Sequence, residues 1–270
     1  MSLSNIFSKK NRALLRELVV TDFKLRYQGS VLGYLWSLLK PLFLFAILYV
    51  VFGEFFKFKS TIEHFGIYLL IGIVLWNFFI EATNQGLQAI VGRGDLIRKI
   101  NFPKYIIVIS GTLSALINLV LNMVVVGIFM TFDGVHLHAT AWLFPLVIVE
   151  LYVFSLAIAF FLSAAFVKYR DISHIWEVLM QAAFYATPVL YPVSYIIGFS
   201  ERAAEILLLN PVAQIIQDAR FTLVTKQTDT LYKLVQNPWL VAIPFVIIAV
   251  TVLWASIYFK KNAKYFAENV

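Results

Sequence analysis

The sequence predicts an all-α integral membrane protein in which a single domain spans the bilayer six times. The 270-residue chain is 61% hydrophobic and only 14% charged, whereas an average soluble domain is about 45–50% apolar and about 25% charged. Its mean hydropathy is +0.82. The apolar residues gather in separate runs, several of which reach the roughly 20 residues that a helix needs to cross a bilayer. These observations exclude a disordered chain and a water-soluble enzyme.

The chain begins with a basic arm, residues 1–30, which holds six Lys/Arg and no long apolar run. A cleavable signal peptide needs such a run, so we expect none here. Leu14, Leu15, Leu18 and Phe23 instead recur at the spacing of one helical face. This pattern predicts an amphipathic helix along the membrane surface, with its cations near anionic headgroups. A passive anchor and a functional interface are both compatible with it.

Six apolar runs follow the arm and are interpreted as transmembrane spans. They are 31–53, 65–82, 105–132, 142–167, 175–191 and 239–259, of which the fifth is short and interrupted by Pro188 and Pro192. A further apolar run, Ile206–Val224, contains Asp218 and Arg220, and a charge at the bilayer centre costs about 2.5–3.5 kcal/mol. We therefore predict that this run is a re-entrant or interfacial hairpin rather than a seventh span.

The positions of the basic residues agree with six spans and two cytoplasmic termini. Fifteen Lys/Arg fall in the segments that this topology places inside, and six fall in those that it places outside, in accordance with the positive-inside rule. The net charge of +7 is thus spread between apolar runs and does not indicate nucleic-acid binding. The lack of cysteine excludes a disulfide framework, a thiolate metal site and a cysteine nucleophile. We expect the whole chain, 1–270, to form one domain.

The longest cytoplasmic connection in this topology is 83–104, which contains the stretch GRGDLIRKINFPKY. Gly94 interrupts regular structure and Asp95 is a suitable helix cap, so a short helix is predicted over Leu96–Ile100, ending before Pro103. A charged helix between two spans suits the docking of a soluble partner. A solvated loop whose cations fix the topology would give the same pattern.

A polar ridge is predicted on the third span. Ser110, Ser114, Asn118 and Asn122 are spaced by four residues and therefore share one face of a helix. Small and amide side chains at this spacing mediate helix packing in membranes, and they can also line a polar pathway. The sequence leaves both interpretations open.

Glu150 lies eight residues into the predicted fourth span, about 12 Å from its start at the rise of an α-helix. A carboxylate at this depth is costly unless it is protonated, paired or beside a polar cavity. A functional role and a structural hydrogen bond are both compatible with this position. A proton relay would need further acids, and we expect no other acid in the middle of a span.

Aromatic residues make up 16% of the chain and run through the first and fifth predicted spans. Aromatic faces suit the apolar faces of sugars, while Tyr and Trp can hydrogen-bond to their hydroxyls, although ordinary packing is the alternative. The chain lacks the GxxxxGK(S/T) phosphate-binding loop and the HExxH and GxSxG motifs. Its four histidines are not spaced as a metal cluster. We therefore expect no enzymatic activity, no metal and no cofactor in this chain.

Three stretches, taken with the six-span layout, resemble the permease subunit of ABC-2 type polysaccharide exporters. They are DFKLRYQGSVLGYLWSLLKPLFLFAILYVVFG at 22–53, DLIRKINFPKYI at 95–106, and YRDISHIWEVLMQAAFYATPVLYPVSY at 169–195 with LLLNPVAQIIQDARFTLV at 207–224. The resemblance covers nearly the whole chain. Members of this family move O-antigen, capsule or teichoic acid chains, usually lipid-linked, out of bacterial cells.

The resemblance implies roles for residues at matching positions. Those that resemble the interface helix are Asp22, Lys24, Arg26 and Tyr27. Those that resemble the coupling helix, which docks into a separate ATPase, are Asp95, Leu96, Ile97, Arg98 and Lys99, with Arg170 and Asp171 as a further contact. The glycan path is expected along Tyr34, Trp36, Phe43, Tyr49, Trp176, Phe184, Tyr185 and Tyr191. Residues 193–238, with Asn210, Pro211 and Arg220, resemble the re-entrant helices that shape the extracellular exit.

The resemblance also implies partners and a location. The permease is expected to be a homodimer in the bacterial inner membrane with two P-loop ATPase subunits, which bind the ATP and Mg. Closure of the ATPases would push the coupling helix, shift the first and fifth spans, and thread a lipid-linked polysaccharide outward. An ABC-2 exporter of a small amphiphile, such as a drug, antibiotic or lipid, is the rival. A membrane-embedded glycosyltransferase or a proton-coupled transporter is the alternative from another class, but the sequence contains no DxD motif.

Overall fold

The computed structural model describes residues 8–269 except for 27–29, 34 and 101, and in these residues every regular element is helical. The longer helices are α2 (Lys9–Arg26), α3 (Leu35–Tyr49), α4 (Phe65–Ala89), α6 (Tyr105–Phe132), α7 (Phe144–Lys168), α8 (Ile172–Ala186), α11 (Pro211–Leu223) and α14 (Ile243–Asn262). The shorter ones are α5 (Gly94–Lys99), α9 (Val193–Ile197), α10 (Glu201–Leu208), α12 (Leu231–Leu234), α13 (Pro238–Val241) and α15 (Phe266–Asn269). Short 3-10 or π segments are η1 (Val50–Phe55), η2 (Phe58–Ser60), η3 (Val91–Arg93), η4 (Ala139–Leu143) and η5 (Ala263–Tyr265).

Five helical segments among the described residues are long and apolar enough to cross a membrane. They are Leu35–Phe55, Phe65–Ala89, Tyr105–Phe132, Ala139–Lys168 and Pro238–Glu268. The predicted fold class is confirmed at this level, because the chain is an all-helical, multi-pass membrane protein. The predicted fifth span, 175–191, corresponds to α8, which has only 15 residues.

The early end of α8 has a local cause. Thr187 follows the last helical residue and has an extended backbone, with φ −102° and ψ 139°. Thr187 also precedes Pro188, and a proline ring disfavours the helical conformation in the residue before it. The helix is therefore shorter than the apolar run that encodes it.

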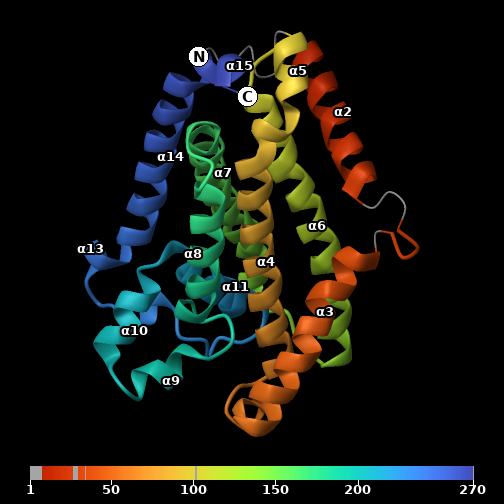
Figure 1. Ribbon diagram of the computed structural model, residues 1–270. Helices are drawn as coiled ribbons and strands as arrows, with labels where there is room; N and C mark the ends of the chain where they lie inside the picture. The colour runs from red at the N-terminus through yellow and green to blue at the C-terminus, as the bar shows by residue number, and fades with distance from the viewer. Residues whose placement is uncertain (1–7, 27–29, 34, 101, 270) are drawn as a thin grey trace.

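Both termini lie at the same end of the molecule (Figure 1). Helices α3, α6 and α8 lead away from this end, and α4, α7 and α14 return toward it. Helices α5 and α15 lie at the end with the termini, whereas α9, α10 and α13 lie toward the opposite end. The chain therefore passes back and forth along one bundle.

Helix α4 forms the centre of this bundle, where it packs against α6 and α7. The close approach of α4 to α7 depends on Gly86, because a Cβ atom there would lie 2.8 Å from the Cα atom of Ala159. Small residues at such crossings let helix backbones approach in membranes. Phe79 and Phe154 stack in the same interface, with ring centroids 5.8 Å apart.

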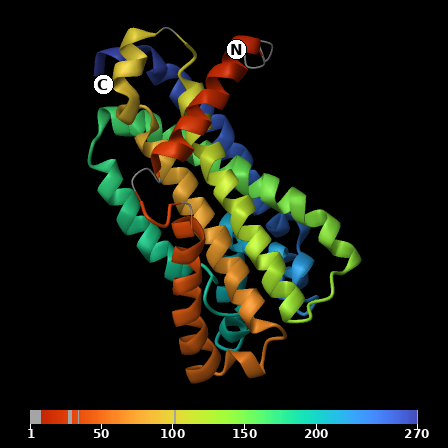
Figure 2. The ribbon, with the colours of Figure 1, turned by 90° about the vertical axis from the view of Figure 1, so that its right-hand side faces the viewer.

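Helix α2 lies obliquely across the bundle and packs against α6 (Figure 2). Leu14, Leu15 and Leu18 are half-buried against an apolar cluster at this end, whereas Arg12 and Arg16 are exposed. The helix thus buries one apolar stripe, the arrangement that its sequence spacing predicts.

Helices α3 and α4 do not have the bounds of the apolar runs that predicted them. The first membrane-length helix starts at Leu35 rather than at Val31, after a bend in which Gly33 has φ +48°, a conformation that glycine adopts without steric cost. Helix α4 continues to Ala89 rather than ending at Ala82. Its last turns are polar, which the apolar run did not reveal.

The run Ile206–Val224 is divided into two helices, α10 and α11, rather than one. Asn210 caps α11, since its Oδ1 accepts a hydrogen bond from the Val212 N–H at 3.0 Å. Pro211 occupies the first position of α11, where its missing N–H does no harm. The same two residues therefore end one helix and start the next.

Candidate functional site

The face of α4 that the bundle leaves open is polar. Within α4, which is described throughout, the positions after Gly66 that are not buried are Asn77, Ile80, Glu81, Asn84, Gln85 and Gln88. Counted from Asn77, they fall at i, i+3, i+4, i+7, i+8 and i+11, which places them along one side of the helix. A stripe that faces lipid would be apolar, because unpaired polar groups in hydrocarbon are costly. The stripe therefore faces a polar path or a protein partner.

A cavity of about 760 Å³ opens beside this stripe, between α3, α4 and α6. Helix α3 contributes Trp36 and Lys40 to its lining, and α6 contributes Asn118. The Asn118 Nδ2 and Gln85 Nε2 atoms donate hydrogen bonds to Glu81 Oε1 at 2.6 and 2.8 Å. The cavity thus presents an oriented carboxylate, an ammonium group and amides beside an indole ring.

A second hollow of about 410 Å³ adjoins the first on the α8 side. The two hollows share Asn77 and Asn84 of α4, and α8 contributes Glu177, Gln181 and Tyr185 to the second. Because of the shared residues, the two hollows form one groove along α4. We call it the α4 groove, lined by Trp36, Lys40, Asn77, Glu81, Asn84, Glu177, Gln181 and Tyr185.

The aromatic residues expected on a glycan path fall into two groups. Trp36, Phe184 and Tyr185 line the α4 groove, and Tyr185 is 69% exposed. Trp176 is turned toward α4, where its Nε1 donates a hydrogen bond to Thr83 Oγ1 at 3.3 Å. The structure thus brings three of these side chains to one groove.

The other expected path residues lie apart from the groove lining. Phe43 is exposed on α3, and Tyr49 stacks on a ring of α4 with centroids 6.1 Å apart. The hydroxyl of Tyr191 donates a hydrogen bond to the Tyr185 carbonyl at 2.9 Å. Tyr34 lies outside the described residues. A role of these residues in a glycan path stays a prediction.

The predicted polar ridge of α6 is buried along its whole length. Ser114 Oγ donates a hydrogen bond to the carbonyl of Ser110 at 3.0 Å, and Asn122 Nδ2 donates to a backbone carbonyl of α3 at 3.4 Å. Asn118 donates to Glu81 and so reaches the groove. The ridge therefore lies inside the bundle, where Asn118 and Asn122 bond to neighbouring helices and Asn118 also lines the polar path.

The segment expected to couple to an ATPase forms the short helix α5. Its Ile97 is buried and Leu96 is half-buried, whereas Asp95, Arg98 and Lys99 are exposed. An apolar anchor that faces the bundle and charges that face outward are what a docking helix requires.

An ion pair braces the turn before α5. Arg93 pairs with Asp22 of α2, and its Nη1 donates a hydrogen bond to Ser110 Oγ of α6 at 3.0 Å. These contacts join α2, the end of α4 and the start of α6 beside the predicted coupling helix. The family resemblance placed Asp22 on the interface helix but did not identify its partner.

The other residues expected at the partner interface are less constrained. Arg170 and Asp171 are exposed in the turn between α7 and α8. Lys24 is exposed on α2, while Tyr27 and the side chain of Arg26 lie outside the described part of the chain. Their contacts with an ATPase stay a prediction.

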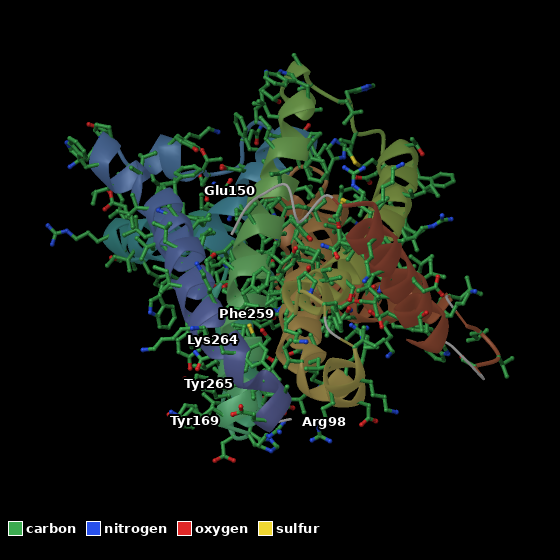
Figure 3. All side chains as sticks on the ribbon, turned by 90° about the horizontal axis from the view of Figure 1, so that it is seen from above. Arg98, Glu150, Tyr169, Phe259, Lys264 and Tyr265 are labelled. Carbon is green, nitrogen blue, oxygen red and sulfur yellow. The ribbon has the colours of Figure 1, made fainter. Side chains whose placement is uncertain are left out.

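Glu150 is half-buried and lies beside Gln214 and Asp218 of α11. Gln214 Nε2 donates a hydrogen bond to Asp218 at 2.5 Å, whereas Glu150 Oε1 has no hydrogen-bond partner among the described residues. The expectation that Glu150 is the only acid in the middle of a span is wrong, because Glu81 lies within α4. In Figure 3, Glu150 lies apart from Arg98 of the predicted coupling helix.

Arg220 of α11 is fully buried, and its guanidinium donates hydrogen bonds to three backbone carbonyls. These belong to Tyr68, Pro188 and Val189, at 2.9, 2.6 and 2.7 Å. The guanidinium also lies 3.7 Å from the centroid of the Tyr68 ring, a cation–π contact. One side chain therefore ties α11 to α4 and to the turn after α8.

The sequence analysis missed the polar residues at the centre of the groove. Asn77, Glu81 and Asn84 recur at spacings of four and three inside and just after an apolar run. That spacing places them on one helical face and was the signal that could have identified them. Averaged hydropathy concealed it, since the other faces of α4 are strongly apolar.

These features, a helical bundle with a polar groove and an outward-facing charged helix at one end, define a membrane permease. Residues 13–224 match the profile of the ABC-2 type transporter family, and the chain belongs to this family. It is the membrane permease subunit and is not itself an ATPase, so its family membership implies a separate ATPase partner.

Similar proteins include two O-antigen export permeases. The O-antigen export system permease protein RfbA of Myxococcus xanthus is 33% identical over 262 residues, which cover 96% of each chain. The protein of the same name from Klebsiella pneumoniae is 26% identical over 217 residues, which cover 78% of this chain and 82% of the relative.

Proposed function

We propose that the chain is the permease subunit of an ATP-driven system that exports O-antigen, or a similar lipid-linked polysaccharide, across the bacterial inner membrane. Its family membership and its similarity to O-antigen permeases support this class of cargo. The observation that carries the proposal is the polar stripe of α4, because it gives an otherwise apolar bundle a lining suited to a hydroxyl-rich molecule.

The side chains of the α4 groove match the chemistry of a sugar chain. The amides of Asn77, Asn84 and Gln181 can both donate hydrogen bonds to sugar hydroxyls and accept them. Trp36 and Tyr185 offer ring faces to the apolar faces of sugars. Such contacts are individually weak and exchangeable, which a polymer that moves past them requires.

A second copy of the chain would close this groove. Helix α8 has no buried residue and α3 has one, Pro41. Both nevertheless carry large apolar side chains, such as Phe43 and Val178. Since α3 and α8 border the groove, pairing these faces across a two-fold axis would enclose one path between two permeases.

The end that holds both termini is the cytoplasmic end in this proposal, and α8 is the fifth of six crossings. Two ATPases, which bind the ATP and Mg, would each press on α5 of one permease. Helix α5 follows α4 directly through η3, so the push reaches the helix that lines the groove. Helices α10 and α11 are the re-entrant elements on the external side, held to α4 by Arg220.

The proposal is tested by export in a bacterium that lacks its own permease and carries this chain with its ATPase. The double variant Asn77→Leu/Asn84→Leu removes the amides shared by both hollows of the groove. Surface polysaccharide is expected to fall about tenfold or more, since each lost hydrogen bond is worth about 1 kcal/mol. Quantitative blotting of surface polysaccharide gives the measurement.

The matched control is Gln227→Leu, which changes an exposed amide in the loop after α11 and should export normally. Co-purification with the ATPase verifies that each variant assembles. Normal polysaccharide export by an assembled double variant would contradict the proposed path. The rival cargo would be favoured by two results in the strain that carries no permease at all. These are normal export of polysaccharide and loss of the efflux of a small amphiphile.

A further inference from the structure

A basic pocket outside the α4 groove lies between the end of α7 and the end of α14. Its volume is about 430 Å³. Lys168 and Arg170 line it on the α7 side, and Asn262 and Tyr265 line it on the other side. Phe266 also borders the pocket and is itself buried. The pocket thus combines an apolar wall with a basic and hydroxyl-bearing rim.

The charge around this pocket is strongly positive. The exposed cations in the stretches 168–171 and 260–268 are Lys168, Arg170, Lys260, Lys261 and Lys264, and the exposed acids there are Asp171 and Glu268. Tyr169, Lys264 and Tyr265 lie along one side of the molecule in Figure 3, which looks onto the end that holds the termini. Cations at the ends of membrane-spanning helices lie at the level of lipid headgroups, so an anionic headgroup is the matching ligand.

An aromatic strip leads along α14 to the pocket. Trp254, Tyr258 and Asn262 are spaced by four residues and therefore share one face of the helix. Phe161 of α7 packs against Trp254 with ring centroids 4.6 Å apart, yet Trp254 remains 53% exposed. Tryptophan and tyrosine favour the boundary between headgroups and acyl chains.

We propose that this pocket binds the phosphate group of an anionic phospholipid whose acyl chains lie along the α14 strip. The ammonium of Lys168, the guanidinium of Arg170 and the hydroxyl of Tyr265 supply donors for a phosphate. The strip favours a lipid over free phosphate, which has no apolar part to cover Trp254. It also favours a lipid over an acidic protein surface, because Trp254 lies within a segment of membrane-spanning length, eight residues or about 12 Å from Asn262 at the pocket. This inference does not depend on the cargo of the permease.

A bound lipid would also brace the predicted coupling helix. Phe266, at the pocket, and Ile97 of α5 belong to the same apolar cluster, and α15 packs against α5. A lipid that joins the ends of α7 and α14 would therefore stabilise the support on which α5 rests.

The test uses the purified complex of permease and ATPase, titrated in detergent with phosphatidylglycerol or phosphatidylcholine. Native mass spectrometry measures the lipid that is retained. The double variant Lys168→Gln/Arg170→Gln should retain phosphatidylglycerol about 30-fold more weakly, on the order expected for two cations near an anionic headgroup. The control Arg202→Gln/Lys226→Gln, which removes two exposed cations in α10 and in the loop after α11, should match the unmodified complex. Phosphatidylcholine, whose trimethylammonium group offsets its phosphate charge, should be retained more weakly than phosphatidylglycerol and to the same extent by all three complexes.

A second measurement needs no substitution. A photoactivatable phosphatidylglycerol should cross-link to the unmodified chain within peptides that contain residues 164–170 and 254–266. Cross-links spread evenly over all spans, or equal lipid retention by the double variant, would overturn the proposal. Displacement of the lipid by inorganic phosphate would assign a free-phosphate site instead. Loss of the ATPase from the double variant, with lipid retention unchanged, would assign the surface to the ATPase.

Discussion

The guanidinium of Arg220 donates hydrogen bonds to three backbone carbonyls and lies over the ring of Tyr68. Among the described residues, no carboxylate is bonded to it. The carbonyls of Pro188 and Val189 are available because the prolines after α8 prevent the chain from using them in a helix. An arginine fits here and a lysine does not, since only the planar guanidinium reaches three acceptors at fixed angles. The residue therefore fixes the position of α11 against two other elements.

Replacing Arg220 by methionine should destabilise the protein strongly. The apolar side chain fills similar space but leaves the carbonyls of Pro188 and Val189 without the donors that Arg220 supplies, and each unsatisfied buried polar group costs about 1–3 kcal/mol. Thermal unfolding of the detergent-purified protein gives the measurement. The matched substitution Arg202→Met, at an exposed arginine of α10, should have little effect. Equal melting temperatures for the two variants would show that the carbonyl contacts of Arg220 do not hold α11 in place.

At the scale of elements, α5 is supported by its neighbours while its charges stay outside. Ile97 is buried in the cluster that α15 completes, and the Arg93–Asp22 ion pair fixes the preceding turn. A force applied to such a helix moves the elements attached to it instead of bending a loop. This arrangement favours transmission from a docked partner to α4.

Reversing one outward charge of α5 should weaken docking without unfolding the permease. In Arg98→Glu, an acidic group replaces a cation that we expect to face the ATPase, and like charges across an interface are strongly unfavourable. We expect ATPase affinity to fall about tenfold or more, measured by co-purification at increasing salt and by stimulation of ATP hydrolysis. The control Lys10→Glu reverses an exposed charge on α2 and should leave both unchanged. Normal stimulation by Arg98→Glu would remove α5 from the coupling interface.

How much of each element the sequence predicts depends on how local its determinants are. Helix α6 is predicted with its observed bounds, Tyr105–Phe132, because Pro103 precedes it and Gly134 follows it in the sequence. The bond from Asn118 to Glu81 joins residues 37 positions apart, so no local pattern identifies it. The contact between α6 and α4 was not predicted for this reason, whereas the polar spacing along α4 is local and could have identified its open face.

At the scale of the whole molecule, the number of crossings is decided by α8. Five helical segments in the described part of the chain reach membrane length by themselves, and an odd number of crossings would place the two termini on opposite sides of the membrane. Both termini instead lie at one end of the bundle (Figure 1). Helix α8 runs from that end toward the other, and it borders the polar groove rather than lipid along one side. A short helix can cross when part of its length is shielded by protein.

Cysteine labelling on the two sides of α8 tests this topology directly. The chain has no cysteine, so Asp171→Cys and Ser200→Cys each provide a single thiol, and both positions are exposed. In intact cells, a membrane-impermeant maleimide should label Ser200→Cys, which lies at the start of α10, and should reach Asp171→Cys only after lysis. Lys264→Cys, near the C-terminus, should behave like Asp171→Cys.

If Asp171→Cys and Ser200→Cys label from the same side, α8 does not cross, and the termini must lie on opposite sides of the membrane. That outcome would place α10 and α11 with the ATPase rather than at the exit, which the positions of the cations along the chain oppose.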